Sequence, residues 1–162
     1  MPVSNGEQAL RERVLGFVRG LGIAVRDARP GEEDFLPGLA INEGAVVIDP
    51  ARWEHPGDLL HEAGHLAVIT AKERAAETLT PTPADEMAAI AWSYAAAVHL
   101  GVAARTLFHD AYKAGGESLA ENFANGCYFG TPMLAYYGMT IEPRRTSPDG
   151  PPPYPRMLRW LR

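Results

Sequence analysis

The segment that most restricts the fold of this chain contains two histidines one helical turn apart. His61 and His65 lie within residues 58–69, a run that is otherwise rich in leucine and alanine. Side chains at this spacing share one face of an α-helix. The apolar residues around them indicate that the helix is buried, and histidines are seldom buried without a partner or a metal ion. The segment therefore predicts a buried helix with two imidazoles directed at one point.

Glu62 completes an HExxH motif with these histidines. Two imidazoles in this register can bind one Zn²⁺ ion at about 2.0–2.1 Å, while the glutamate faces the same ion without binding it. There it would accept a proton from metal-bound water, the general-base role of zinc peptidases. At average composition the motif arises by chance in about one in a few hundred chains of this length. We therefore expect His61 and His65 to be metal ligands and Glu62 to be the general base.

Gly64 lies inside the motif, where glycine costs about 1 kcal/mol of helix stability relative to alanine. A glycine in a buried helix often allows another backbone to approach closely. We therefore expect a second element to pack directly against the helix at Gly64.

A catalytic zinc site uses a third protein ligand and keeps one position open. Val68 and Ala71 stand where the metzincin extension of the motif needs glycine and histidine, which excludes that class. Glu86 lies in the first turn of the next predicted helix, and we expect it to be the third ligand because its neighbour Asp85 is expected to cap that helix. Glu121 is the main alternative, either as a ligand or as the hydrogen-bond partner of a ligand histidine. Weaker alternatives are Glu117, His109 and Asp110.

Other chemically active side chains are expected to have structural roles. His55 and His99 are expected to be structural or on the surface. Cys127 is the only cysteine, which excludes an intramolecular disulfide and a cysteine-based zinc site, and we expect it to be a small core residue. Three tyrosines could donate to a transition-state oxyanion, although packing is the expected role of each: Tyr94, Tyr112 and Tyr128.

The hydrophobic pattern predicts an N-terminal helix, a small antiparallel sheet and a mostly helical second half, which is an α+β fold. Ser4 and Glu7 form a capping-box pattern before the first helix. Thr82, Pro83 and Asp85 open a helix that is expected to end at Gly101. Strands are expected at 23–26, 39–41 and 45–48, the last two joined by a hairpin turn at 42–44. Further helices are expected at 102–113, at 118–128 and from 131 to a cap at Gly138.

Residues 1–142 are expected to form a single domain, followed by a proline-rich linker at 143–153. Residues 154–162 contain several large apolar side chains and are expected to dock on the domain. The net charge of −5 argues against a nucleic-acid surface. The sequence shows neither a signal-peptide pattern nor a membrane span, so the expected location is cytoplasmic.

The N-terminal helix, the early sheet, the HExxH segment at residues 59–67 and the acidic residue that opens an alanine-rich helix together resemble the ImmA/IrrE metallopeptidase-like family of the zincin superfamily. The resemblance covers roughly residues 5–100. The third ligand of that family lies in a Glu-Ala-Asn-x-Phe-Ala type segment, to which residues 86–91 are similar and which residues 121–124 also echo. The resemblance thus implies a minimal zincin-like fold and supports Glu86 as the third ligand. Two features depart from related proteins: no helix-turn-helix module is apparent, and Ile90 stands where thermolysin-like enzymes have an aspartate.

Together these observations favour a peptidase that binds one Zn²⁺ ion through His61, His65 and Glu86. A peptide or protein substrate is the expected partner, with a regulatory protein as a further candidate. One alternative is a non-catalytic zinc-binding regulatory or interaction module of the same fold. Another is a structural zinc site closed by a fourth ligand such as Glu121 or His109. Two imidazoles and a carboxylate would also suit manganese, iron, cobalt or nickel.

Overall fold

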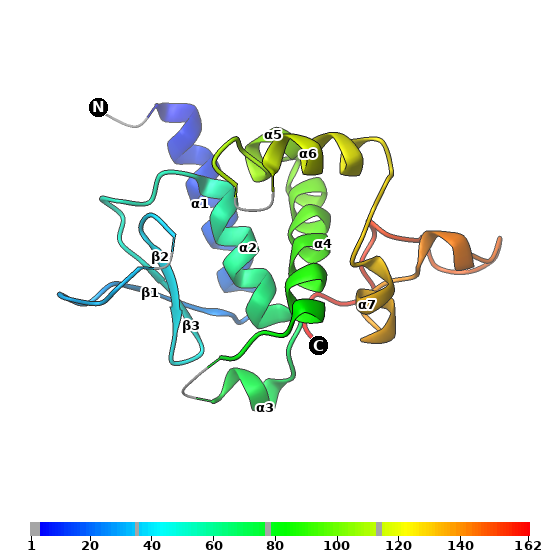
Figure 1. The fold of residues 1–162 in the computed structure, drawn as a ribbon, viewed down its shortest axis with the longest axis horizontal. Coiled ribbons are helices and arrows are strands. Elements are labelled where there is room, and N and C mark those ends of the chain that lie inside the picture. The colour runs from blue at the N-terminus through cyan, green and yellow to red at the C-terminus, as the bar shows by residue number, and fades with distance from the viewer. Residues whose placement is uncertain (1–3, 35, 77–78, 113–114) are drawn as a thin grey trace.

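Helix α2 (Pro56–Ala67), which carries the HExxH motif, runs through the middle of the molecule between a small sheet and helix α4 (Pro83–Leu100) (Figure 1). The computed structural model describes residues 4–34, 36–76, 79–112 and 115–162. Every residue of α2 is buried, as its apolar composition predicts. The elements form an α+β fold, which confirms the predicted class.

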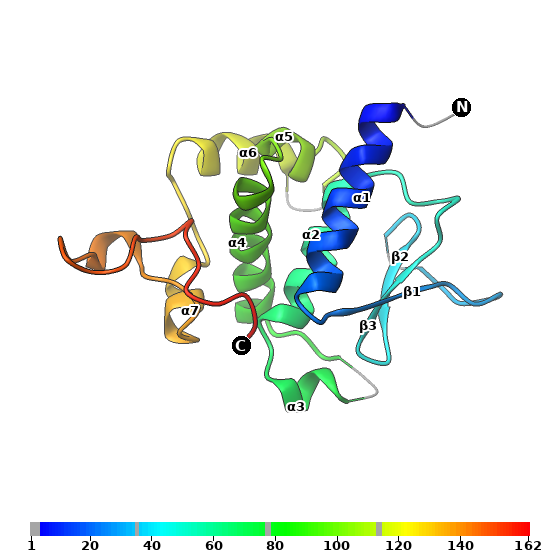
Figure 2. The same ribbon diagram turned by 180° about the vertical axis from the view of Figure 1, so that it is seen from behind.

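Helix α1 (Asn5–Gly20) lies against α2 and leads into the sheet (Figure 2). The hydroxyl of Ser4 accepts a hydrogen bond from the backbone N–H of Glu7, which is one half of the predicted capping box. The Glu7 carboxylate instead accepts a hydrogen bond from Arg11, one turn further along the helix. Of the capping box, therefore, the structure shows only the Ser4 half.

The sheet has the order β1-β3-β2, with β3 in the centre. Its strands are β1 (Ala24–Asp27), β2 (Leu39–Asn42) and β3 (Ala45–Ile48). Strands β2 and β3 form the predicted antiparallel hairpin through Glu43 and Gly44, whose φ angles of 52° and 72° fit a two-residue type I′ turn. Strand β1, however, pairs with β3 in parallel, so the sheet is mixed and the predicted antiparallel sheet is wrong. The reason is that the connection at 28–38 carries the chain to the far edge instead of turning back beside β1.

Helix α4 begins and ends where the sequence predicts. The Thr82 hydroxyl and the Asp85 carboxylate form a reciprocal capping box, and Pro83 occupies the first turn. Gly101 ends the helix with a φ of 68°, the left-handed conformation that glycine adopts readily. Helices α2 and α4 contact each other more extensively than any other pair of elements in the described residues.

The remaining helices are short: α3 (Ala71–Arg74), for which no separate helix was predicted, α5 (Ala104–Leu107), α6 (Gly116–Ala124) and α7 (Thr131–Tyr136). Helix α7 begins at Thr131 and is followed by Gly138 with a φ of 71°, as predicted. The helix predicted at 102–113 stops at Leu107, because Phe108 leaves helical geometry with a φ of −97° and a ψ of 71°; its last predicted residue, Lys113, lies outside the described residues. The helix predicted at 118–128 ends at Ala124, since Gly126 adopts a φ of 77° just beyond it.

The C-terminal segment contacts the helices that carry the HExxH motif and Glu86. The indole N–H of Trp92 donates to the carbonyl of Trp160, and the backbone N–H of Arg162 donates to the carbonyl of Ala67 at the end of α2. Leu158, one of the large apolar side chains of this segment, is 50 % exposed. The preceding proline-rich stretch contains a short 3₁₀ helix, η1 (Pro143–Arg145).

Candidate metal centre

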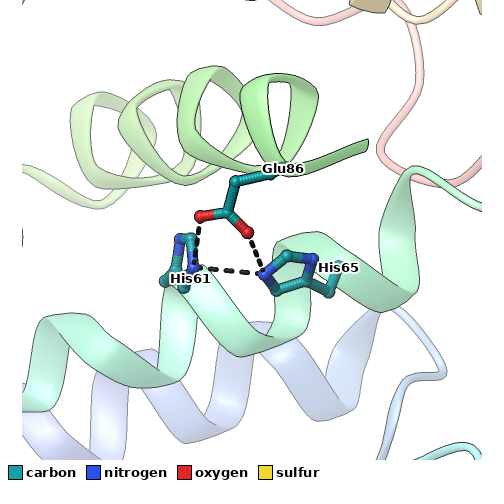
Figure 3. A group of neighbouring side chains, drawn as sticks. All are labelled: His61, His65 and Glu86. Carbon is teal, nitrogen blue, oxygen red and sulfur yellow. Dashed lines mark hydrogen bonds and ion pairs between the residues drawn. The ribbon is translucent and has the colours of Figure 1, made fainter. Parts of the chain in front are cut away.

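His61, His65 and Glu86 converge between α2 and α4 (Figure 3). The Nε2 atoms of His61 and His65 lie 3.1 Å apart. One carboxylate oxygen of Glu86 lies 3.3 Å from Nε2 of His61 and the other lies 3.0 Å from Nε2 of His65. The structure thus brings together the three side chains that the sequence predicts as ligands.

The spacing and chemistry of these atoms fit a metal ion. An ion bound tetrahedrally at about 2.0–2.1 Å has ligand atoms about 3.3–3.4 Å apart, which is close to the separations observed here. Two imidazole nitrogens and a carboxylate oxygen are also a ligand set that zinc and several other transition metals accept. The group could therefore hold a metal ion.

The two helices are held close by small residues. A Cβ atom added at Gly64 would lie 2.9 Å from the carbonyl oxygen of Ala89 on α4, so only glycine fits without a shift. This contact confirms the close approach predicted at Gly64. Because Glu86 lies one turn before Ala89, the same approach brings its carboxylate to the histidines.

The charge of Glu86 is stabilised by the histidines. Hydrogen bonds from His61 and then His65 hold the pKa of this carboxyl well below its ordinary value. The side chain is 48 % exposed, whereas the two histidines are buried. Glu86 is therefore an ionised member of the group, on the side that solvent can reach.

Glu62 is 6 % exposed and lies on α2 directly after His61. Its charge contributes to raising the pKa of Tyr112, behind the larger effects of burial and of the Glu86 and Asp58 charges. Glu62 therefore lies within electrostatic range of the residues around His61, as its place in the motif predicts.

Tyr112 contacts Nδ1 of His61, the ring nitrogen that does not face Glu86. Its hydroxyl oxygen lies 2.8 Å from Nδ1 of His61, and the two rings meet at 81°. The sequence does not distinguish Tyr112 from Tyr94 and Tyr128, and packing is the role expected of each of them. The chain offers no local signal for this contact, because the two residues are far apart in the sequence and the loop between α5 and α6 sets their approach.

His109 is paired with Asp58 and takes no part in the convergent group. Its Nε2 lies 2.8 Å from a carboxylate oxygen of Asp58, near the start of α2. The ring of His55 stacks on that of His109 at 3.7 Å. His109 is thus neither the third nor a fourth member of the group, and His55 has the structural role expected for it.

Glu121 does not reach the histidines. It is exposed and faces Arg105 at 3.7 Å, so both of its predicted roles, as ligand and as partner of a ligand histidine, are wrong. The signal that suggested it was only a short acidic-apolar pattern, whereas α6 turns this residue to solvent. Glu117 and Asp110 are also exposed.

The remaining candidate residues are placed away from the group. Tyr94 and Tyr128 pack in an aromatic cluster with Phe123, in line with the packing role expected of them. His99 is on the surface, where its ring contacts Phe17 and Trp160. Cys127 is exposed rather than in the core, because it follows the turn at Gly126 that ends α6.

Comparison with known proteins adds no relative: no protein-family model, curated protein or solved structure matches the chain. Among the helices of the described residues, none has the length and apolar character to cross a membrane.

Proposed function

We propose that this chain is a zinc-dependent peptidase with a zincin-like fold, similar to the ImmA/IrrE metallopeptidase-like proteins. The observation that carries the proposal is the convergence of His61 and His65 with Glu86, beside a buried Glu62 in the HExxH register. The two histidines and Glu86 would hold the ion. A bound zinc ion would supply Lewis-acid polarisation of a substrate carbonyl and lower the pKa of a water molecule.

In this mechanism Glu62 is the residue that moves the proton. Its carboxylate takes the proton from the water that attacks the peptide carbonyl and then gives it to the departing amine. The low exposure of Glu62 favours this role, since a carboxylate shielded from bulk water exchanges its proton with the reacting groups rather than with solvent. The negative charge of Glu86 would partly balance the positive charge of a bound ion.

The variant Glu62→Gln separates the chemistry from metal binding. It should bind one zinc ion as the wild type does, measured by native mass spectrometry, but lose the chelator-sensitive cleavage of a peptide library. If Glu62→Gln cleaves peptides as fast as the wild type, the mechanism is wrong. If the wild type binds zinc and cleaves no peptide or protein substrate, the alternative of a non-catalytic zinc-binding module is supported instead.

A further inference from the structure

Two side chains of the loop after α5 meet α2 at positions one helical turn apart. His109 contacts Asp58, and Tyr112 contacts His61, each through a distance of 2.8 Å. Both pairs join residues that are 51 positions apart in the sequence, so the loop and the helix run side by side in matching register. Asp58 and His61 are buried, and Tyr112 is only 9 % exposed, so water competes little for these contacts.

The Tyr112 hydroxyl lies where a partner for a metal-binding histidine is needed. An imidazole that binds a metal through Nε2 carries its hydrogen on Nδ1, and that N–H almost always donates to a nearby acceptor, which fixes the orientation of the ring. In this structure Nε2 of His61 faces Glu86, and Nδ1 faces the Tyr112 oxygen. A tyrosine hydroxyl can accept such a hydrogen bond as well as donate one.

We propose that Tyr112 is a positioning residue: it accepts the Nδ1–H of His61 when Nε2 binds a metal ion, and the Asp58–His109 pair holds Tyr112 in place. This inference rests on the proposed metal site but not on peptidase activity.

The two histidines are supported differently. Among the described residues, the buried Nδ1 of His65 has no hydrogen-bond partner, whereas Nδ1 of His61 has Tyr112. His61 is therefore the ligand whose ring orientation is set before the ion arrives. Removing the Tyr112 hydroxyl should accordingly weaken metal binding through His61 alone.

The first test compares two buried tyrosines that each lose one hydroxyl. Tyr112→Phe keeps the ring and removes its contact with His61. Tyr154→Phe is the matched control, because its hydroxyl donates a 2.8 Å hydrogen bond to the carbonyl of Ala91. In competition with a chromophoric chelator, Tyr112→Phe should bind zinc about 10–100-fold more weakly than the wild type, and Tyr154→Phe within about twofold of it.

A spectroscopic signal distinguishes positioning from a general loss of structure. In the zinc-loaded wild type, the Nδ1–H proton of His61 should give a slowly exchanging NMR resonance with a cross-peak to the ring protons of Tyr112. This resonance should move or disappear in Tyr112→Phe and persist in Tyr154→Phe. Because the wild type alone must show the cross-peak, its absence overturns the proposal even if Tyr112→Phe fails to fold.

The role of His109 is tested through its dependence on Tyr112. His109→Phe keeps an aromatic ring against His55 but cannot form a hydrogen bond with Asp58, so it should weaken zinc binding several-fold. His109→Gln keeps a hydrogen-bond donor for Asp58 and should retain most of the wild-type affinity. In the Tyr112→Phe background, His109→Phe should change affinity by less than about twofold, because its effect acts through the missing hydroxyl. An equal loss in both backgrounds would contradict this route.

The outcomes separate this inference from the proposed function. If the wild type binds no zinc, both fail. If the wild type binds zinc and Tyr112→Phe binds it equally well, only the role of Tyr112 fails. If the affinity falls as expected but the wild type cleaves no peptide, the role of Tyr112 stands and the peptidase does not.

Discussion

A carboxylate oxygen of Glu86 lies 3.0 Å from Nε2 of His65, although Glu86 is in the first turn of α4 and His65 is near the end of α2. Helices α2 and α4 must therefore be held in one axial register and at a short separation. Three features of the chain provide this arrangement: the three convergent side chains, the glycine between the histidines, and the cap that begins α4.

Replacing Glu86 tests whether it is a ligand. Glu86→Gln removes the charge of the side chain but keeps its shape. Zinc affinity should fall by at least about 100-fold, which equals or exceeds the largest loss expected for a residue that only hydrogen-bonds to a metal ligand. Glu121→Gln, at the exposed site that the sequence also suggested, should leave the affinity unchanged. Chelator competition on both variants measures the difference, and a large loss in Glu121→Gln would contradict the assignment.

Adding a methyl group at Gly64 should push the two helices apart. Gly64→Ala introduces a Cβ atom that would lie 2.9 Å from the Ala89 carbonyl oxygen. Overpacking of this kind costs about 1–3 kcal/mol, which outweighs the gain of about 1 kcal/mol in helix propensity. The control is Gly16→Ala in α1, where a Cβ atom meets nothing within 4 Å and where the substitution should stabilise the protein. Urea unfolding of both metal-free variants checks the opposite signs, and a stabilised Gly64→Ala would refute the close approach.

The cap of α4 should influence the metal site, whereas the cap of α3 should not. Thr82 and Thr70 each form a complete capping box. Thr82→Ala should cost about 1 kcal/mol and loosen the first turn of α4, which carries Glu86, so that zinc binds several-fold more weakly. Thr70→Ala should leave zinc affinity unchanged. Thermal unfolding and chelator competition on the two variants measure the effects, and equal zinc affinities in the two would argue against this coupling.

Acid should remove a contribution of Glu32 to stability. Hydrogen bonds from Arg26, and then from Arg29 and Asn42, hold the pKa of Glu32 well below its ordinary value. A carboxyl with a lowered pKa in the folded state stabilises the protein above its unfolded pKa, about 4.3 for glutamate, and loses this contribution as the pH falls towards the folded value. The difference in unfolding free energy between wild type and Glu32→Gln should therefore be largest near neutral pH and shrink below about pH 4.

Glu33→Gln changes an exposed neighbour of Glu32 and serves as the control in urea unfolding between neutral and acidic pH. Its difference from the wild type should stay small throughout. A gap for Glu32→Gln that widens in acid would have the wrong sign for this explanation.

Local sequence patterns predicted the parts of the site that depend on one helix at a time. The spacing of His61 and His65 defines their common face, and the cap at Thr82 places Glu86 in a first turn. Gly64 indicated a close neighbour because its cost in helix stability needed a compensating contact. Each of these inferences concerns backbone geometry within a few residues.

Features that depend on the path of the chain could not be predicted in the same way. The parallel pairing of β1 with β3 follows from where residues 28–38 travel, and alternation of apolar residues carries no information on strand direction. The contact of Tyr112 with His61 depends on the chain leaving helical geometry at Phe108. Glu121 shows the converse, since its local pattern resembles that of Glu86 but it lies on the solvent-exposed face of its helix.

Cys127 gives the protein a ready attachment point for a reporter. It is the only thiol in the chain and it is exposed, so a maleimide dye would label one position without any substitution. The same thiol can join two copies of the chain under oxidising conditions, so biophysical samples need a reductant that does not bind zinc, such as a phosphine.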